Sequence, residues 1–494
     1  MKQTFLLESV MGQNRLAVIE DGVLCELYYE RPGLEKLSGN IYVGRVENVL
    51  PGMNAAFVDI GLDKNAFLYA GDIQLDTRND KALADELSRA RIEKLVHPGQ
   101  EILVQVVKEP GGTKGPRISS HITVPGRLMV LLPTMAYAGV SKKIACVETR
   151  SRLHRMAADL VEKTKMGVIV RTAAENASQE DIEREFENLK KLWQAISTRG
   201  KHFKAPKLIH SDGSLCLRAV RDMLNEDTQE IVADNGEMFE ALKGYAAMLA
   251  PEWTDRIRLH EGMTPLFDLY RVDTQADKAA GRYVWLKSGG SLVIEETEAL
   301  TVIDVNTGKF TGKKSLPETI FKINCEAAEE IMRQLRLRDI GGIIIIDFID
   351  MENNTEKQKL LEILKEISKS DRNRTNIGSI TPLGLVEVTR KKVRQSMTKQ
   401  LMHICSACGG NGYAPTYETT ARRIVRDVWK RNRSGQSSVL LIEAIEPVIG
   451  WVRSIGLPEG VIAYGLKANG IKDWEYTISP ADAYDLPDNA KILK

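Results

Sequence analysis

Two apolar runs that each end on an aspartate constrain the fold of this chain more than any other feature of its sequence. In TVIDVN the apolar residues lead to Asp304, and in GGIIIID four consecutive isoleucines lead to Asp347, 43 residues further on. That spacing accommodates one long helix, predicted near residues 318–339, between two neighbouring strands, and we interpret the second strand as buried. We therefore expect an α/β layer with both carboxylates at strand ends, where α/β folds commonly bind ligands.

Length, charge and cysteine content exclude several classes of protein. A chain of 494 residues is too long for one hydrophobic core, so we expect three or more domains. With 68 Lys and Arg against 67 Asp and Glu, the net charge is +1, so a nucleic-acid site would have to be a local basic patch. We find no signal peptide and no apolar run near the roughly 20 residues that span a bilayer. Isolated cysteines are typical of a reducing compartment, and we expect a cytoplasmic protein.

Changes of pattern along the chain predict a multidomain α/β protein. Short strands with Gly and Pro between them, over 38–127, are typical of a small β-barrel. Helices and strands of 216–280 are expected to pack back on the first strands, and a cysteine-containing segment and a short α/β tail follow the α/β layer. The predicted boundaries are 1–37, 38–127, 128–215, 216–280, 281–400, 401–415 and 416–494.

Paired carboxylates at strand ends are suited to holding a divalent cation. Mg²⁺ prefers oxygen ligands and keeps several waters, so one or two aspartates and a substrate phosphate suffice to bind it. Asn306 lies two residues beyond Asp304, on the same side of an extended strand, and could hold a phosphate or a water. Arg374 could neutralise charge that develops in a transition state. Alternatively, each aspartate only caps the helix that follows it, and the residues alone leave both interpretations open.

Longer segments of the chain resemble the ribonuclease E/G family. The resemblance is carried by EALTVIDVNTGKF, EEIMRQLRLRDIGGIIIIDFIDM, LGLVEVTRKKVRQSM and CSACGGNG, and upstream by IYVGRVENVLPGMNAAFVDIG, TKGPRIS and GVIVRTAAENAS. These segments are collinear over roughly residues 1–420. The resemblance implies an RNase-H-like scaffold split in sequence, an inserted S1 barrel of the oligonucleotide-binding type, a 5′ sensor, a DNase-I-like catalytic layer, a zinc link and a small C-terminal α/β domain.

The resemblance also implies an activity. Members of the family are endoribonucleases that use Mg²⁺-activated water to cut single-stranded, AU-rich RNA. They leave 5′-phosphate and 3′-hydroxyl ends, favour 5′-monophosphorylated RNA, and act on rRNA precursors and in mRNA decay. By matching position, Asp304 and Asp347 correspond to the magnesium-binding aspartates, whereas Asn306 and Arg374 match residues assigned catalytic roles beside them.

Three residues of the predicted barrel match RNA-holding positions of the family. Phe57 and Phe67 match positions that stack bases, and Lys114, in GGTKGPR, matches a lysine that anchors RNA. The alternative is that both phenylalanines belong to the barrel core. Because Val58 and Leu68 alternate with them and can supply that core, we favour stacking.

A second set of residues matches the 5′-monophosphate sensor of the family. In GVIVRTA a strand delivers Arg171 and Thr172 to its end, and a guanidinium beside a hydroxyl suits a terminal phosphate. Gly126 and Val130 match further positions of that pocket. Lys142 stands where the family carries arginine; it keeps the charge but loses the fork of donors, so its part in the sensor is open.

The segment CSACGGNG resembles half of a zinc knuckle. Cys405 and Cys408 can share one Zn²⁺, and the glycines permit a tight turn, but a structural zinc wants four ligands and the chain has no second CxxC. Two protomers would complete a Cys₄ site, as in the family, which predicts a zinc-linked homodimer and leaves a tetramer open. Ser406 stands where the family usually has proline. A redox CxxC and a local site that recruits His403 are the alternatives.

Two other classes of function compete with this interpretation. A non-catalytic S1-type RNA-binding or ribosome-associated protein would explain the barrel but not residues 281–400. A ribonuclease that uses histidine and the 2′-hydroxyl of RNA is disfavoured, because none of the seven histidines lies beside the aspartates. The basic run Arg390–Arg394 is either a solvated face or a guide for RNA. The chain ends near 494 without a long arm, so we expect the compact form of the family.

Overall fold

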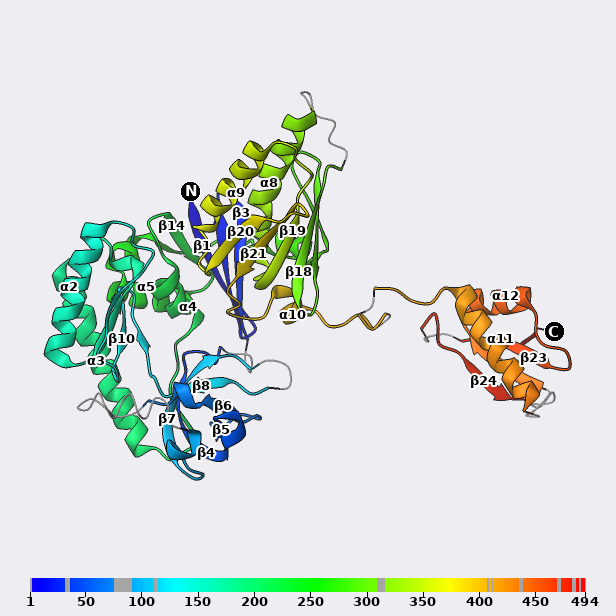
Figure 1. Ribbon diagram of the computed structural model, residues 1–494, viewed down its shortest axis with the longest axis horizontal. Coiled ribbons are helices and arrows are strands. Elements are labelled where there is room, and N and C mark those ends of the chain that lie inside the picture. The colour runs from blue at the N-terminus through cyan, green and yellow to red at the C-terminus, as the bar shows by residue number, and fades with distance from the viewer. Residues whose placement is uncertain are drawn as a thin grey trace. The chain divides into compact units, whose positions relative to one another are not determined.

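The computed structural model describes residues 2–31, 36–74, 91–110, 114–308, 316–406, 408–410, 412–434, 439–468, 472–481, 486–487 and 490–493. The chain divides into two compact units, Met1–Gln400 and Leu401–Lys494 (Figure 1). Both units mix helices and strands, which confirms the predicted α/β class.

The first strands of the chain form one sheet with strands from the 216–280 region. Strand β1 pairs antiparallel with β2 and parallel with β14, in the order β15-β14-β1-β2-β3. Phe5 and Leu7 pack against helix α5, whereas Leu6, between them, packs on the other face against α7. The expectation that the chain returns to its own first strands is confirmed. The elements are β1 (Gln3–Val10), β2 (Gln13–Glu20), β3 (Val23–Glu30), α4 (Leu215–Arg218), β14 (Thr228–Ala233), α5 (Gly236–Leu249), β15 (Ile257–Leu259), α6 (Leu266–Leu269) and α7 (Val272–Ala280).

A closed barrel follows the first three strands. Its order is β4-β5-β6-β8-β7, and pairing of β7 with β4 closes the ring. The interior is apolar and includes Val46, Val58 and Leu68. A strand from outside the predicted range, β13 (Lys207–His210), joins β4. The barrel strands are β4 (Ile41–Leu50), β5 (Ala55–Asp59), β6 (Ala66–Tyr69), β7 (Glu101–Lys108) and β8 (Arg117–Ser119).

A small sheet in the order β11-β12-β10-β9 comes next, with two long helices packed on it. Helix α3 begins at a capping box, in which Ser178 and Asp181 satisfy each other's backbone N–H groups. Its buried residues share one apolar cluster with the strands and with α2. The elements are β9 (Val124–Pro125), β10 (Met129–Leu132), β11 (Ala138–Val140), α2 (Val147–Thr164), β12 (Gly167–Val170) and α3 (Gln179–His202).

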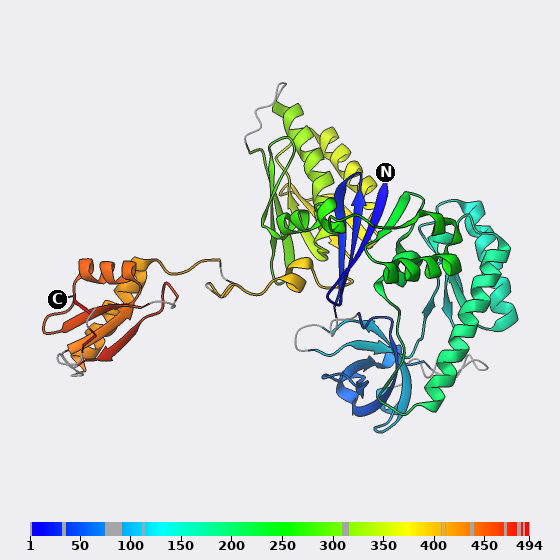
Figure 2. The ribbon, with the colours of Figure 1, turned by 180° about the vertical axis from the view of Figure 1, so that it is seen from behind.

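The predicted α/β layer is a sheet in the order β16-β17-β18-β19-β21-β20. Helices α8 and α9 cover one of its faces (Figures 1 and 2). Ile344 and Ile346 are buried beneath them, but Ile343 is 52% exposed on the other face, so the strand that was expected to be buried is covered on one face only. The elements are β16 (Tyr283–Trp285), β17 (Ser291–Glu296), β18 (Leu300–Asn306), α8 (Leu316–Leu337), β19 (Gly342–Asp347), α9 (Asn354–Ser368), β20 (Thr375–Ile380), β21 (Leu385–Arg390) and α10 (Met397–Leu401).

The second unit contains the CxxC segment and a small α/β fold. Its sheet has the order β24-β22-β23-β25, and the apolar faces of α11 and α12 share one core with it. None of the helices in the described ranges is long and apolar enough to cross a membrane. The elements are α11 (Tyr417–Arg433), β22 (Val439–Ala444), α12 (Glu446–Ile455), β23 (Ile462–Lys467), β24 (Thr477–Pro480) and β25 (Lys491–Ile492).

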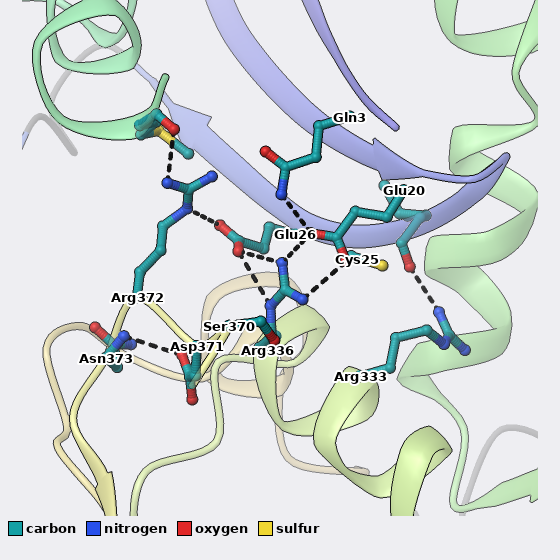
Figure 3. A network of polar contacts seen from close by, with 12 residues as sticks. Gln3, Glu20, Cys25, Glu26, Arg333, Arg336, Ser370, Asp371, Arg372 and Asn373 are labelled. Atoms are coloured by element: carbon teal, nitrogen blue, oxygen red, sulfur yellow. Dashed lines mark hydrogen bonds and ion pairs between the residues drawn. The ribbon is translucent and has the colours of Figure 1, made fainter. Parts of the chain in front are cut away.

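Buried ion pairs join the α/β layer of residues 283–390 to the N-terminal sheet. Arg336, near the end of α8, donates to Glu20 at 2.6 Å and to Glu26 at 2.7 Å (Figure 3). Arg372 donates to the second oxygen of Glu26 at 3.1 Å and to the carbonyl of Met223 at 2.7 Å. Burial alone would raise the pKa of Glu26, but the guanidinium groups of Arg372 and Arg336 outweigh it and lower the pKa to about 2. The ionised carboxylate therefore stabilises the fold at neutral pH, and this contribution is lost as the pH falls from the ordinary value of 4.5 through about 2.

The substitution Arg336→Met should destabilise the first unit strongly. It leaves the buried carboxylates of Glu20 and Glu26 without the cation between them, and breaking a buried pair from one side costs about 3–5 kcal/mol. Urea denaturation of the full chain, followed by circular dichroism, measures the loss. Arg422→Met is the control, because its pair with Glu418 is exposed and contributes within ~0.5 kcal/mol. Equal effects of the two substitutions would contradict a stabilising role for the buried ion pairs of Arg336.

Candidate active site and nucleic-acid interface

The two predicted aspartates are direct neighbours across a pair of parallel strands. In the register of β18 with β19, Asp304 is opposite Asp347. Because side chains alternate along a strand, Ile303 and Ile346 point into the core while both carboxylates lie on the face without helices. Asn306 joins them there: its side-chain N–H donates to Asp304 Oδ2 at 2.7 Å. Three of the four predicted catalytic residues are thus brought together.

The negative charge of this site is not compensated by the part of the chain that the structure describes. Burial, followed by the charges of Asp304 and Asp350, raises the pKa of Asp347. Among the described residues, no Lys, Arg or His forms an ion pair with any of these three carboxylates. Asp350 was not anticipated, although its place three residues after Asp347, in DFID, was a signal that could have found it. Carboxylates that repel one another at a surface are suited to a divalent cation.

Arg374 does not belong to this cluster. Thr375, the next residue, pairs with Arg390, and Arg390 pairs with Gly342 at the start of β19. Asp347 ends that strand, five residues away, which is about 16 Å at the rise of an extended chain. A catalytic role for Arg374 beside the aspartates is therefore not supported by the geometry of the sheet. Its segment faces the 128–223 region instead, where Lys143 Nζ donates to the carbonyl of Asp371 at 3.4 Å.

The two arginines that bound the basic run Arg390–Arg394 pair with residues of the first unit. Arg390 donates to Asp371 at 2.7 Å and to Asp339 at 3.0 Å, and all three side chains are buried. Arg394 also pairs with Asp339, and its guanidinium lies 3.8 Å from the centre of the Tyr28 ring. Both arginines thus hold the fold together, whereas Lys391 and Lys392 of the same run are exposed, so a role of the run in guiding RNA stays a prediction.

Phe57 and Phe67 form an aromatic pair on the outside of the barrel. They are opposite each other in β5 and β6, with ring centroids 6.1 Å apart in an edge-on arrangement. Both rings are half-buried, whereas the neighbouring Val58 and Leu68 are fully buried in the barrel core. The prediction that Val58 and Leu68 supply the core is confirmed. Tyr69 follows Phe67 at the same face and is 42% exposed; this third aromatic was missed, although its i+2 spacing could have revealed it.

Lys114 lies at the same edge of the barrel. It is exposed, and the segment after it runs beside β6, where the Phe67 N–H donates to the carbonyl of Pro116 at 2.8 Å. Gly115 makes this approach possible, because a Cβ there would lie 2.1 Å from the backbone oxygen of Asn65. The structure therefore brings the segment that carries Lys114 beside the strand that carries Phe67.

The residues predicted to read a 5′ end also come together. The Arg171 N–H donates to the carbonyl of Leu128 at 2.7 Å, and Arg171 Nη1 donates to the carbonyl of Gly126 at 2.5 Å. Val130 pairs with Ile169 in the neighbouring strand. Nη1 of Arg171 also donates to Asp222 at 2.7 Å, an ion pair that sequence reasoning did not find.

Thr172 follows Arg171 in the chain, and Ser141 and Lys142 come from the neighbouring segment after β11. The hydroxyls of Thr172 and Ser141 are 3.1 Å apart, and Lys142 follows Ser141 with an exposed side chain. The backbone supports this arrangement, since the Ser141 N–H donates to Val170 at 2.8 Å. Lys142 therefore adjoins a residue that contacts Thr172, although none of the contacts between described residues ties its amine to Arg171.

A nearby carboxylate explains why residue 126 is a glycine. A Cβ at Gly126 would lie 2.0 Å from Glu185 Oε1, and both carboxylate oxygens accept from the Leu128 N–H at 3.0 Å. Burial raises the pKa of Glu185 even though backbone N–H groups of the loop oppose that shift. Glu185 was missed, because EREFEN has the pattern of an ordinary solvated helix face.

The CxxC segment forms a tight turn in the second unit. The Gly409 N–H donates to the carbonyl of Cys405 at 2.8 Å, and Cys408 Sγ accepts from the Gly412 N–H at 3.3 Å. Gly409, Gly410 and Gly412 all have positive φ, which only glycine adopts freely. Among the described residues, no group of three or more His, Cys, Asp or Glu side chains is arranged to hold a metal, so a complete local site with His403 is not found there.

The alternation in β6 predicts opposite sensitivities for two adjacent residues. Leu68→Ala should lower the free energy of unfolding by about 2–5 kcal/mol, because it opens a cavity in the barrel core. Phe67→Ala should cost distinctly less, since its ring is half exposed. Thermal and urea denaturation of the two variants compare them, and a larger loss for Phe67→Ala would contradict the face assignment.

Comparison with known proteins supports the resemblance noted in the sequence. The model of the ribonuclease E/G family matches residues 123–393, more than half of the chain. Ribonuclease G of Salmonella typhimurium is 40% identical over 447 residues, which are 90% of this chain and 91% of that protein. Ribonuclease G of Escherichia coli K12 is 39% identical over the same shares of the two chains, and ribonuclease E of a Nostoc species is 41% identical over 76% of this chain and 54% of its own length. The chain belongs to the ribonuclease E/G family.

Proposed function

We propose that this chain is an endoribonuclease of RNA processing and decay that hydrolyses phosphodiester bonds in single-stranded RNA. The observation that carries the proposal is the in-register pairing of Asp304 with Asp347 on an open sheet face, in a chain 40% identical to a ribonuclease G. AU-rich segments of rRNA precursors and of mRNA are the proposed substrates, and 5′-phosphate and 3′-hydroxyl ends the proposed products.

The reacting centre would hold Mg²⁺ through Asp304 and Asp347. The fit rests on chemistry that the chain displays: two adjacent carboxylates, a third nearby in Asp350, and a raised pKa at Asp347 caused by burial and by the other two charges. When bound, Mg²⁺ polarises a phosphoryl oxygen and makes an attacking water more acidic. Asn306 fixes the orientation of the Asp304 carboxylate through its 2.7 Å hydrogen bond. The open face leaves room for a phosphate of the RNA chain beside them.

The outside of the barrel would hold the RNA. Phe57 and Phe67 offer half-exposed ring faces and edges, and each stacked base contributes about 1–3 kcal/mol. Tyr69 extends this surface, and Lys114 supplies a cation for the backbone. We interpret the barrel as an S1 domain of the oligonucleotide-binding type on this basis.

The pocket around Arg171 would bind a 5′-monophosphate. Arg171 and Thr172 supply charged and hydroxyl groups, the loop from Gly126 to Val130 lines the pocket, and Lys142 adds charge at its rim. We propose that a 5′-monophosphate held here raises the rate of cleavage elsewhere on the same RNA.

The remaining domain assignments are part of the same proposal. The N-terminal sheet, built from 1–37 and 216–280, would be the RNase-H-like scaffold, and 281–400 the DNase-I-like layer. The insertions would be the S1 barrel at 38–127 and the sensor at 128–215, although the sensor sheet includes Val124. Residues 401–415 would form the link, and 416–494 a small assembly domain.

Cys405 and Cys408 would bind half of a zinc site. Two thiolates are half of the tetrahedral set that structural Zn²⁺ takes, so a second protomer would supply the others. The glycine turn that brings both cysteines onto one loop supports this arrangement. The proposed assembly is a zinc-linked homodimer.

Substitution of either aspartate should abolish cleavage while RNA binding persists. For Asp304→Asn or Asp347→Asn we expect the rate to fall about a hundredfold or more, since several kcal/mol of charge stabilisation are lost. The measurement is cleavage of a 5′-labelled single-stranded RNA with Mg²⁺ or EDTA, together with a binding isotherm. Glu387→Gln is the control, because Glu387 lies on the same open face, opposite Ile345, and is exposed.

The product ends separate the competing functions in the same experiment. Ends with 5′-phosphate and 3′-hydroxyl agree with metal-activated water, whereas a 2′,3′-cyclic phosphate would contradict it. Binding without any cleavage by the wild-type chain would favour a non-catalytic RNA-binding protein. Activity retained in either aspartate variant would refute the assignment of the pair.

Zinc content tests the link between protomers. We expect half a zinc atom per chain and a dimer by light scattering, because each chain supplies two of four ligands. Cys405→Ser and Cys408→Ser should each remove the zinc and yield monomers, while Cys146→Ser, at an exposed cysteine elsewhere, should change neither. One zinc per chain, or none, would overturn the shared site.

A further inference from the structure

The guanidinium of Arg171 is restrained on one side and open on the other. Nη1 carries two hydrogens, and both have acceptors: the carbonyl of Gly126 at 2.5 Å and Asp222 Oδ1 at 2.7 Å. Nε and Nη2 have no hydrogen-bond partner among the residues that the structure describes. Their N–H groups are parallel and match two oxygens of a phosphate. The two contacts of Nη1 therefore leave the Nε and Nη2 edge of Arg171 available to a ligand.

Asp222 is itself held from the interior. Arg221 donates to Asp222 Oδ2 through Nε at 3.1 Å and through Nη2 at 2.7 Å. Arg221 is buried and is anchored in turn to the buried Asp212, at 3.0 Å. The N–H of Asp212 donates to the side chain of Asn40, at the start of the barrel, at 2.9 Å. Hydrogen bonds and ion pairs thus connect the start of the barrel to Arg171, through Asp212, Arg221 and Asp222.

The local backbone that carries Asp222 is unusual. Residues Ala219–Met223 form a π-helical turn, a conformation that is rare and is concentrated at functional sites. Burial would raise the pKa of Asp222, but Arg221 and Arg171 outweigh it and lower the pKa, so the carboxylate is ionised at neutral pH. Its two oxygens are divided between the two arginines, one oxygen each.

We infer that Asp222, oriented by Arg221, is a positioning residue that fixes Arg171 so that its Nε and Nη2 edge faces a terminal phosphate. This inference rests on the proposed 5′-monophosphate pocket and names the residue that determines its specificity. Preorganisation of the donor fork lowers the entropy lost when the phosphate binds. A single phosphate group matches that fork, whereas a 5′-hydroxyl does not use it.

Variants of Asp222 should therefore change the preference between substrates. We would compare kcat/KM for one single-stranded RNA carrying a 5′-monophosphate or a 5′-hydroxyl. Asp222→Ala should reduce the preference for the monophosphate about tenfold, the loss of one charge-assisted hydrogen bond. The loss should appear in KM for the monophosphorylated RNA, and cleavage of the 5′-hydroxyl RNA should be unchanged. Asp222→Asn keeps an acceptor for Arg171 and should retain more of the preference than the alanine variant.

Controls separate the position of Arg171 from charge and from folding. Glu226→Ala removes a negative charge four residues away, where the carboxylate bonds Asn176 rather than Arg171, and should leave the preference unchanged. Asp222→Ala could fail to fold because Arg221 loses a partner. In that case Asp222→Asn tests the inference, and we expect it to lose part of the preference for the 5′-monophosphorylated RNA.

Three outcomes would overturn the inference. An unchanged preference in Asp222→Ala would show that Arg171 needs no orientation. A stronger preference in both Asp222 variants would mean that the carboxylate competes with the phosphate. An equal loss on both RNAs would mean a structural role only. Arg171→Lys is the separate test of the pocket: if it keeps the full preference, the phosphate proposal fails, independently of Asp222.

Discussion

The first unit depends on the guanidinium of Arg336, which is buried between two carboxylates from a different part of the chain. Taking these three charges out of water is costly, and only close, directional pairing offsets that cost. Because Glu20 and Glu26 lie on the N-terminal sheet and Arg336 on α8, the α/β layer cannot slide on the N-terminal sheet without leaving a charge buried and unpaired. Arg372 extends the same network to the turn that carries Asp222.

Two groups of carboxylates in this protein differ in whether a cationic side chain pairs with them. In the N-terminal sheet, arginines pair with the buried carboxylates and lower the pKa of Glu26. At the candidate active site, Asp304 and Asp347 on the open sheet face and the nearby Asp350 have no such partner among the described residues, and the pKa of Asp347 rises. A protein stabilised by burying paired charges leaves a cluster unpaired where an external cation can complete it, which is the physical basis of the proposed active site.

The positions of several charged residues depend on strand pairing and ion pairs with distant parts of the chain, which the sequence does not show. Arg374 was expected beside the aspartates, yet strand pairing puts it at the other end of the sheet. Arg390 and Arg394, which bound a basic run with two possible roles, pair with Asp339 and Asp371 and with the ring of Tyr28. Lys391 and Lys392 between them are exposed. An isoleucine run predicts a strand but not how many of its faces are covered, and here helices cover only one.

Local pattern determined which residues form strands and which way their side chains point. Alternation separated Phe57 and Phe67 from the core residues Val58 and Leu68, and the spacing around α8 made Asp304 and Asp347 neighbours at strand ends. Only the tertiary structure decided which charged residues form ion pairs. Arg336 and Glu26 are 310 residues apart in the sequence, and Arg171 and Asp222 are 51 residues apart. The periodicity of a strand or helix depends on residues that are close in the sequence, whereas the ion-pair partner of a charged side chain depends on how sheets and helices pack together.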